Sequence, residues 1–359
     1  MMPVASVNKG TGPVSEDWFQ AALAPMATRP EHGDTSHAVH MLAQHYGIDT
    51  EIVPLASEVE RTDELRLPDG RRLILKTSAR PEAVESFAFQ SGTLSDLEAY
   101  ADVIAPKVLR TRDGALMFRD GRTCGYVQTR LEGAPLHAEE QTPAIARQSG
   151  QALGRLNLAL ARCDPPSTRR PVLWHIGCWT RLSALSCHLP DGPLAEHVRA
   201  AMADYLSQVA PRLDALDWQI THNDPSPHNM LETRGGTGFI DFGDGGWNPR
   251  LQDLAVAAGH MVTDPELPLG GAEQVLAGYA SVIPLSDLDR AVIVGLMRAR
   301  QAALVLINAW RSHLFPDQAI YINKNVARSQ NGLAILSRLD ARAEAAAVTA
   351  ALSQPPQAA

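Results

Sequence analysis

The sequence has few cysteines, and their spacing does not indicate a metal site. The four are Cys124, Cys163, Cys178 and Cys187, in a chain of 359 residues. No two of them form a Cys-x-x-Cys pair, and four thiols are too few for a scaffold held together by disulfides. This excludes the small disulfide-rich class of proteins, and we expect reduced thiols.

The sequence also lacks a basic stretch and an N-terminal signal. The net charge is −8, and no cluster of Lys and Arg stands out. Nucleic-acid binding depends on basic side chains that neutralise phosphates, so we expect no nucleic-acid partner. The N-terminus has no apolar core typical of a signal peptide, and the apolar run 291–297 is soon interrupted by Arg298 and Arg300. We therefore expect a cytoplasmic protein with a small-molecule partner and no membrane segment.

The sequence does contain enough apolar material for a sizeable core, since 45% of its residues are hydrophobic. Residues 53–77 alternate between apolar and polar side chains on both sides of Pro68-Asp69-Gly70. This pattern is typical of a β-hairpin, and it predicts Lys76 near the end of the second strand. Up to Pro135 the chain is mostly strand-like, with helices predicted at 35–46 and 82–100, whereas helical spacing dominates afterwards.

Two motifs in the helical half carry the chemistry. Residues 221–230 read THNDPSPHNM, which contains His222-x-Asp224-x-x-x-x-Asn229, and Asp241 begins an Asp-Phe-Gly motif shortly afterwards. The β-compatible residues between the motifs predict a hairpin that brings Asn229 and Asp241 to the same edge. Amide and carboxylate oxygens suit Mg²⁺, which is usually held by one or two side chains plus phosphate oxygens. We therefore predict Asn229 and Asp241 as magnesium ligands.

Asp224 has the properties of a catalytic base. Phosphoryl transfer needs a carboxylate that orients the attacking hydroxyl and accepts its proton. Asp224 lies on a proline-rich loop that restricts the backbone, and the protein-kinase signature has the same order of motifs. A transition-metal cluster of His222, Asp224 and His228 is the alternative. The loop is not the helical His-Glu-x-x-His frame and has no third His or Cys nearby, which disfavours that cluster.

Lys76 is a candidate for binding nucleotide phosphates, because it ends a strand that precedes a helix. Such a lysine needs an acidic partner. Glu85 has the right chemistry and lies early on the predicted helix, while Gln90 and Gly92 occupy the region where a glutamate is expected. We therefore name Glu85 as the predicted partner.

The stretches HNDPSPHN, FIDFGD and LQDLAVAAGHMV resemble the aminoglycoside phosphotransferase/choline kinase superfamily. LASEVERTDEL, RRLILKTS, PKVLRTRDG and VLAGYASVIPLSDLD look most like its hydroxylysine kinase branch. The similarity covers roughly residues 35–339. It implies an α+β, two-lobed protein-kinase-like fold and Mg²⁺-dependent transfer of the γ-phosphoryl group from ATP or GTP. The implied organisation is an N-terminal extension, partly disordered (1–34), a nucleotide-binding N-lobe (35–131), a helical C-lobe (132–340) and an Ala-rich tail (341–359).

The resemblance also implies roles for individual residues. In the N-lobe, Lys76 clamps the phosphates, Ser57 lies in the turn 57–62 that covers them, and Thr129 and Leu131 lie in the hinge that meets the purine. In the C-lobe, Asp224 is the base, and Asn229 and Asp241 are the metal ligands. The predicted contacts to the acceptor come from Asp244, Trp247 and Arg300.

Two departures from the family pattern stand out. Asn223 occupies a position where the superfamily usually has glycine, and Asn is the side chain that best tolerates a positive φ there. The turn SEVERT contains no glycine, so its backbone cannot enclose phosphates as a glycine-rich loop does.

The predicted reaction is O-phosphorylation of a small hydroxylated amine or amino acid, such as 5-hydroxylysine. Among enzymes, an aminoglycoside, homoserine or choline-type kinase is the alternative. A catalytically inactive nucleotide-binding regulatory module is the alternative from another class. Further candidates for the acceptor site are Trp174, Trp179, Arg298, Trp310 and Arg311.

Overall fold

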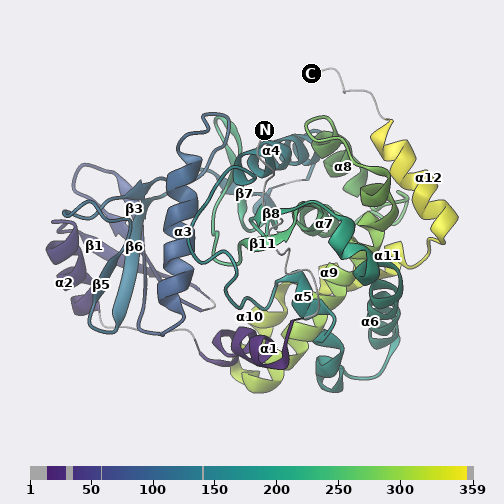
Figure 1. Ribbon diagram of the computed structural model, residues 1–359, viewed down its shortest axis with the longest axis horizontal. Coiled ribbons are helices and arrows are strands. Elements are labelled where there is room, and N and C mark those ends of the chain that lie inside the picture. The colour runs from purple at the N-terminus through teal and green to yellow at the C-terminus, as the bar shows by residue number, and fades with distance from the viewer. Residues whose placement is uncertain (1–13, 30–34, 58, 140, 354–359) are drawn as a thin grey trace, which may run out of the picture.

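A six-stranded antiparallel sheet forms one end of the computed structural model, which describes residues 14–29, 35–57, 59–139 and 141–353 (Figure 1). The strand order is β1-β2-β3-β6-β4, and β5 also pairs with β6. The predicted hairpin is present as β2 and β3, in which Lys76 lies opposite Thr62. The bounds are β1 Glu51–Leu55, β2 Arg61–Arg66, β3 Arg72–Ser78, β4 Val108–Leu109, β5 Phe118–Asp120 and β6 Thr123–Thr129.

Alternation along β3 gives the sheet two different faces. Leu73 and Leu75 are buried on one face in a cluster with residues of α2 (Thr35–His45). Ile74 and Lys76 point to the opposite face, where a cavity lies and where α3 (Ala83–Leu97) separates the sheet from the helical lobe (Figure 1). Side chains two residues apart share a face of a strand. The order of residues in RLILKTS therefore places the lysine on the side of α3.

The second lobe is built mainly from helices around the long helix α9. α9 begins with a capping box, in which the Ser286 hydroxyl accepts the Asp289 N–H and the Asp289 carboxylate accepts the Ser286 N–H. This helix is long and apolar enough to cross a membrane, yet 89% of its apolar window is buried inside the protein. Its apolar residues thus belong to the core. The helices of this lobe are α4 Pro143–Leu160, α5 Ile176–Trp179, α6 Pro193–Asp204, α7 Arg250–His260, α8 Ala272–Ala280, α9 Asp287–Leu314, α10 Ala319–Ile322, α11 Val326–Leu336 and α12 Ala341–Leu352.

Several boundaries differ from those predicted. Helical spacing over residues 194–216 predicts one continuous helix, but α6 ends at Asp204. A π-helical turn (Tyr205–Val209) and a 3₁₀ helix (Ala210–Ala215) follow, and the second contains Pro211. The predicted tail begins with α12, in which Val348 is buried against the core. Residues 1–13 and 30–34 of the predicted, partly disordered N-terminal extension lie outside the described residues, as do residues 354–359.

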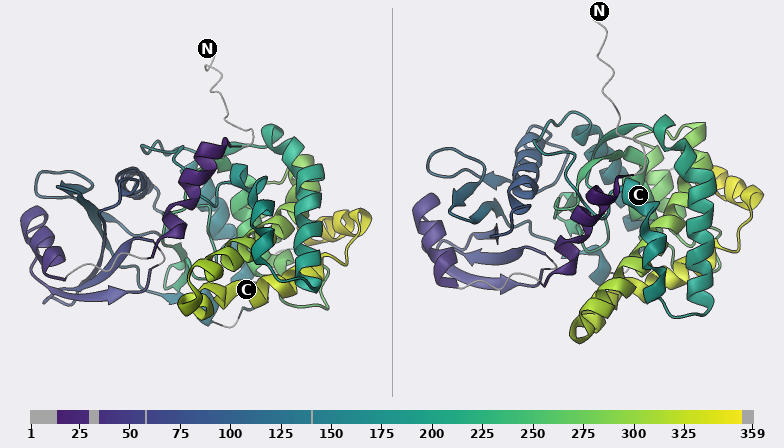
Figure 2. Two further views of the ribbon diagram at one scale, coloured as in Figure 1. Left: turned by 90° about the horizontal axis from the view of Figure 1, so that it is seen from below. Right: turned by 60° about the horizontal axis from the view of Figure 1, so that its bottom comes forward.

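The segment predicted as an N-terminal extension contains a packed helix. α1 (Glu16–Leu23) lies where the two lobes meet (Figure 2), and Phe19 is buried in the core of the helical lobe. Ala22 and Met26 line the cavity between the lobes. The extension thus contributes to the wall of the cavity.

Two glycines allow α4 and α8 to approach closely. A Cβ atom at Gly150 would overlap the carbonyl oxygen of Val275, and one at Gly278 would overlap the carbonyl oxygen of Arg147. Backbone atoms cannot move aside as a flexible side chain can. The close approach matters for the site because α4 also contains Asn157. The Asn157 side chain donates a hydrogen bond to Asp253, the residue that holds the catalytic loop.

We predict that Gly150→Ala lowers the free energy of unfolding by about 2 kcal/mol, because the added methyl group forces α4 and α8 apart. Gly259→Ala in α7 is the matched control, since a Cβ there would meet no atom closer than 3.7 Å. Urea-induced unfolding of both variants checks this. Equal stability of the two would contradict the account of the helix contact.

Candidate active site

A cavity of about 670 Å³ lies between the lobes and brings together most of the predicted site residues. The N-lobe contributes Ser57, Lys76, Glu85 and Leu131 to its wall, and the C-lobe contributes Asp224, Asn229, Asp241, Asp244 and Arg300. The catalytic loop, the Asp-Phe-Gly motif and the sheet that contains Lys76 therefore all contribute to the wall of this cavity.

The catalytic loop is held by a buried carboxylate. Asp253, in the first turn of α7, accepts the backbone N–H groups of His222 at 3.0 Å and Asn223 at 2.7 Å. It also accepts an N–H of the Asn157 side chain at 2.8 Å. Burial raises the pKa of Asp253, whereas these hydrogen bonds act in the opposite direction. Asp253 thus fixes the loop that begins after β8 (Trp218–Thr221).

Asn223 takes the position at which the superfamily usually has glycine, and it adopts the backbone conformation that glycine would provide. Its φ is +69°, a left-handed conformation that Asn tolerates better than most residues. Its side chain donates to the carbonyl oxygen of Asp244 at 2.9 Å and accepts a hydrogen bond from Gln252. The departure from glycine is therefore compensated by two side-chain bonds.

The Asp224 carboxylate lines the cavity and is held by three side chains. Its Oδ2 accepts the Asn229 side-chain N–H at 2.8 Å and lies 3.3 Å from the Ser226 hydroxyl. Its Oδ1 lies 2.9 Å from Nη2 of Arg300, which comes from α9. The side chain of Asp224 is 19% exposed, so it can be reached from the cavity.

The predicted hairpin between the two motifs is confirmed. β9 (Met230–Thr233) and β10 (Gly236–Phe239) pair antiparallel, and the N–H of Ile240 donates to the carbonyl oxygen of Asn229 at 2.9 Å. This pairing brings the start of β9 and the end of β10 to the same edge. Asn229, directly before β9, and Asp241, two residues after β10, therefore lie at this edge.

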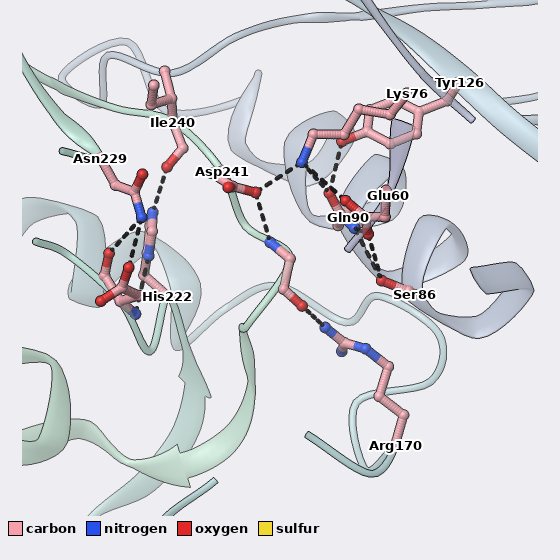
Figure 3. A network of polar contacts seen from close by, with 12 residues as sticks. Glu60, Lys76, Ser86, Gln90, Tyr126, Arg170, His222, Asn229, Ile240 and Asp241 are labelled. Carbon is pink, nitrogen blue, oxygen red and sulfur yellow. Dashed lines mark hydrogen bonds and ion pairs between the residues drawn. The ribbon is translucent and has the colours of Figure 1, made fainter. Parts of the chain in front are cut away.

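The donor atoms of this pair fit a magnesium ion. Asn229 uses its Nδ2 for Asp224, and Asp241 uses its Oδ1 for Lys76 at 2.7 Å. Among the described residues, Oδ1 of Asn229 and Oδ2 of Asp241 accept no hydrogen bond, which leaves one hard oxygen on each side chain. Figure 3 shows the Asp241 carboxylate between Asn229 and Lys76. The described part of the chain contains no group of three His, Cys, Asp or Glu that could hold a metal, so the alternative cluster at His222 and His228 is not supported.

Lys76 is buried among polar partners on both lobes (Figure 3). Its ammonium group lies 2.7 Å from Asp241, 3.0 Å from Gln90 Oε1 and 3.5 Å from Glu60 Oε2. Burial opposes the charge, yet Asp241 and Glu60 raise the pKa of Lys76 well above its ordinary value. In turn, the charge of Lys76 lowers the pKa of Asp241. The lysine is therefore a fixed positive charge at the boundary of the two lobes.

Three predictions need correction. Glu85 lines the cavity but forms no ion pair with Lys76, because Gln90 and Glu60 occupy that position. Thr129 does not line the cavity: its hydroxyl and its N–H both bond to the backbone of Lys107, and its neighbours Gln128 and Arg130 line the cavity instead.

Trp247 does not line the cavity either. It lies in β11 (Gly246–Pro249), which pairs with β8, and its ring lies 5.3 Å from the guanidinium carbon of Arg169. Trp174 is the tryptophan that lines the cavity, and its ring lies 4.0 Å from the guanidinium carbon of Arg300. Nearness to Asp241 in the sequence was thus a poor guide to the acceptor site.

Sequence reasoning missed Arg170, a buried cation beside the Asp-Phe-Gly motif. It donates to the carbonyl oxygen of Gly243 (Figure 3). Its guanidinium carbon lies 4.2 Å from the centre of the Phe89 ring. Burial lowers the pKa of Arg170 to about 10. Arg170 follows an irregular segment without a motif, so no local pattern marks it.

The chain is similar to known phosphotransferases. Residues 51–290 match the APH phosphotransferase enzyme family, which is more than half of the chain. The chain therefore belongs to this family, and it is a small-molecule phosphotransferase. The predicted superfamily and α+β, two-lobed fold are confirmed.

The similar proteins include a hydroxylysine kinase, which supports the predicted hydroxylysine kinase branch, and a homoserine kinase. A hydroxylysine kinase of Danio rerio is 25% identical over 338 residues, covering 88% of this chain and 94% of that protein. A homoserine kinase of Zymomonas mobilis is 26% identical over 282 residues, covering 74% of this chain and 83% of that protein. The solved structure of an amicoumacin kinase in complex with AMP-PNP, Ca²⁺ and Ami has a TM-score of 0.64 at 13% identity, covering 86% of this chain and 95% of that one. This last likeness shows the fold alone.

We predict that Asn223→Ala destabilises the protein by about 1–2 kcal/mol more than Asn223→Gly. Both variants lose the two side-chain bonds, but only Ala is strained at φ +69°. Chemical denaturation of the two variants measures the difference. If the Ala variant proved as stable as the Gly variant, the loop would not need a left-handed residue here.

Proposed function

We propose that this protein transfers the γ-phosphoryl group of ATP or GTP to the hydroxyl of a small hydroxylated amino acid, of the kind that hydroxylysine represents. The observation that carries the proposal is the position of Asp224. Its carboxylate faces the cavity, bonded to Asn229 and Arg300, and the same cavity is lined by Lys76 and Asp241. A proton acceptor and a cation for phosphates thus share one space, as phosphoryl transfer requires.

In this proposal Asp224 orients the acceptor hydroxyl and takes its proton as the bond to phosphorus forms. Asn229 and Ser226 keep the carboxylate oriented from its Oδ2 side. Holding the hydroxyl in line with the phosphoryl group reduces the entropy lost on reaching the transition state. The base therefore contributes mainly through position.

Lys76, Asn229 and Asp241 form the donor end of the proposed site. Lys76 neutralises phosphate charge, and the free oxygens of Asn229 and Asp241 suit a magnesium ion. When bound, Mg²⁺ would neutralise charge on the transferred group. Ser57 and Leu131 line the same cavity. The similarly folded amicoumacin kinase was solved in complex with AMP-PNP, which supports a nucleotide as the phosphoryl donor.

Arg300 forms the acceptor end, where we propose that it meets the acceptor's carboxylate. Its side chain is 5% exposed and lines the cavity beside Trp174 and Asp224. Among the described residues, its Nε and Nη1 have no hydrogen-bond partner, a costly state for a buried cation. A carboxylate drawn to Arg300 would also compete with Asp224 for it, which would leave the base free to face the hydroxyl.

Asp244 completes the acceptor end in this proposal. It lines the cavity near the Asp-Phe-Gly motif, and its carboxylate suits the acceptor's ammonium group. A zwitterionic amino acid would thus meet a charge of each sign. The names of the relatives, hydroxylysine kinase and homoserine kinase, both describe kinases of hydroxylated amino acids. Homoserine is therefore the second candidate, and a cytoplasmic location remains part of the proposal.

We expect Asp224→Asn to lower kcat at least about 1000-fold, because an amide cannot accept the proton. Nucleotide binding should change little, since the substitution keeps the shape of the side chain. Coupled nucleotide consumption gives kcat, and calorimetry with a non-hydrolysable analogue gives the affinity. A variant that retained wild-type turnover would remove Asp224 from the chemistry.

The acceptor proposal predicts that Arg300→Met raises KM for hydroxylated amino acids about tenfold or more, and that Arg300→Lys raises it less. The matched comparison uses amino alcohols that have the same hydroxyl but no carboxylate. For these acceptors the wild type and Arg300→Met should differ little in KM. An equal loss with both kinds of acceptor would show that Arg300 does not recognise the carboxylate.

A further inference from the structure

The partner of Lys76 on the helix is an amide rather than an acid. In kinases of this fold a lysine on β3 is held by a glutamate on the following helix. Here Gln90 of α3 takes the place of that glutamate: its Oε1 accepts from Lys76 at 3.0 Å and from the Tyr126 hydroxyl at 2.9 Å. A neutral amide orients the ammonium group but does not balance its charge.

The missing negative charge comes from the turn between β1 and β2. Glu60 lies in this turn, and its Oε2 lies 3.5 Å from Lys76. Its other oxygen, Oε1, accepts from Gln90 Nε2 at 2.9 Å and lies 3.3 Å from the Ser86 hydroxyl (Figure 3). The Glu60 side chain is only 14% exposed. Glu60 is thus fixed by two residues of α3 and directed at the lysine.

We propose that Glu60 is the positioning residue for Lys76, so that the acid normally carried by the helix is supplied by the turn that faces the nucleotide. This inference rests on the proposed kinase function. Among the described residues, Lys76 forms ion pairs only with Glu60 and Asp241. If Asp241 serves as a metal ligand, Glu60 is the acid that continues to hold the lysine.

The arrangement links the turn to the lysine. Val59 and Glu60 both line the cavity, as does Ser57 at the start of the turn. Any movement of the turn therefore moves the charge that holds Lys76. A turn without glycine, which cannot enclose phosphates with its backbone, would in this way still contribute to phosphate binding through one side chain.

The hydrogen bonds of the cluster allow the acid and the amide to be exchanged. Gln90 Nε2 donates to Glu60, so in the double variant Glu60→Gln/Gln90→Glu the direction of this bond is reversed. Lys76 and the Tyr126 hydroxyl would then donate to a carboxylate on α3. The exchange keeps the number of charges and nearly the same volume, and it moves the acid to the helix.

The test compares four proteins with the wild type. They are Glu60→Gln, the double variant, Glu85→Gln at the acid that the sequence favoured, and Glu98→Gln at an exposed position of α3's C-terminal end. Calorimetry with Mg²⁺ and AMP-PNP gives the affinity without turnover, and steady-state assays give kcat and the nucleotide KM. Thermal unfolding without nucleotide checks that each variant is folded.

We expect Glu60→Gln to weaken AMP-PNP binding and to lower kcat, each about tenfold, and the double variant to recover most of both losses. Glu98→Gln should stay close to the wild type, and Glu85→Gln should lose less affinity and less kcat than Glu60→Gln. If Glu60→Gln binds and turns over like Glu98→Gln, or if Glu85→Gln shows the loss instead, the inference fails while the kinase function stands. Absence of nucleotide binding by the wild type would overturn both.

Discussion

The contact between Lys76 and Asp241 is the interaction on which the site depends. The lysine comes from the central part of the N-lobe sheet and the aspartate from the end of a C-lobe hairpin, and 2.7 Å separates their charged atoms. The side chain of Lys76 is buried, with 7% of it exposed, whereas the side chain of Asp241 is 52% exposed where it borders the cavity. The low dielectric on the lysine side makes this attraction stronger than that of a pair exposed on both sides. This ion pair joins the two lobes at the point where we propose that the donor phosphates bind.

In the rest of the site, hydrogen bonds from neighbouring residues hold the catalytic loop, the base and the lysine in place. Asp253 holds the catalytic loop through backbone N–H groups, and Asn229 orients the base. Gln90 orients the lysine without adding charge. Buried polar groups are costly when unpaired, so these supports also explain how a cavity with so many charges is compatible with a stable fold.

Sequence reasoning succeeded where a short segment fixes the geometry by itself. Asn229 and Asp241 flank one hairpin, and Lys76 follows from alternation on one strand, so spacing was enough to bring them together. It failed where the position depends on distant packing. Glu60 is directed at Lys76 by α3, Trp247 is turned away by pairing with β8, and Thr129 bonds to the backbone of Lys107. None of these partners is near in the sequence, so no local pattern could indicate them.

The central claim is transfer of a phosphoryl group to an acceptor hydroxyl, and ³¹P NMR of the complete reaction tests it most directly. The purified protein would be incubated with ATP or GTP, Mg²⁺ and 5-hydroxylysine or homoserine. The account predicts a new phosphate-ester resonance that grows in step with the nucleoside diphosphate. Formation of inorganic phosphate alone, or no consumption of nucleotide with any hydroxylated amino acid, would contradict it.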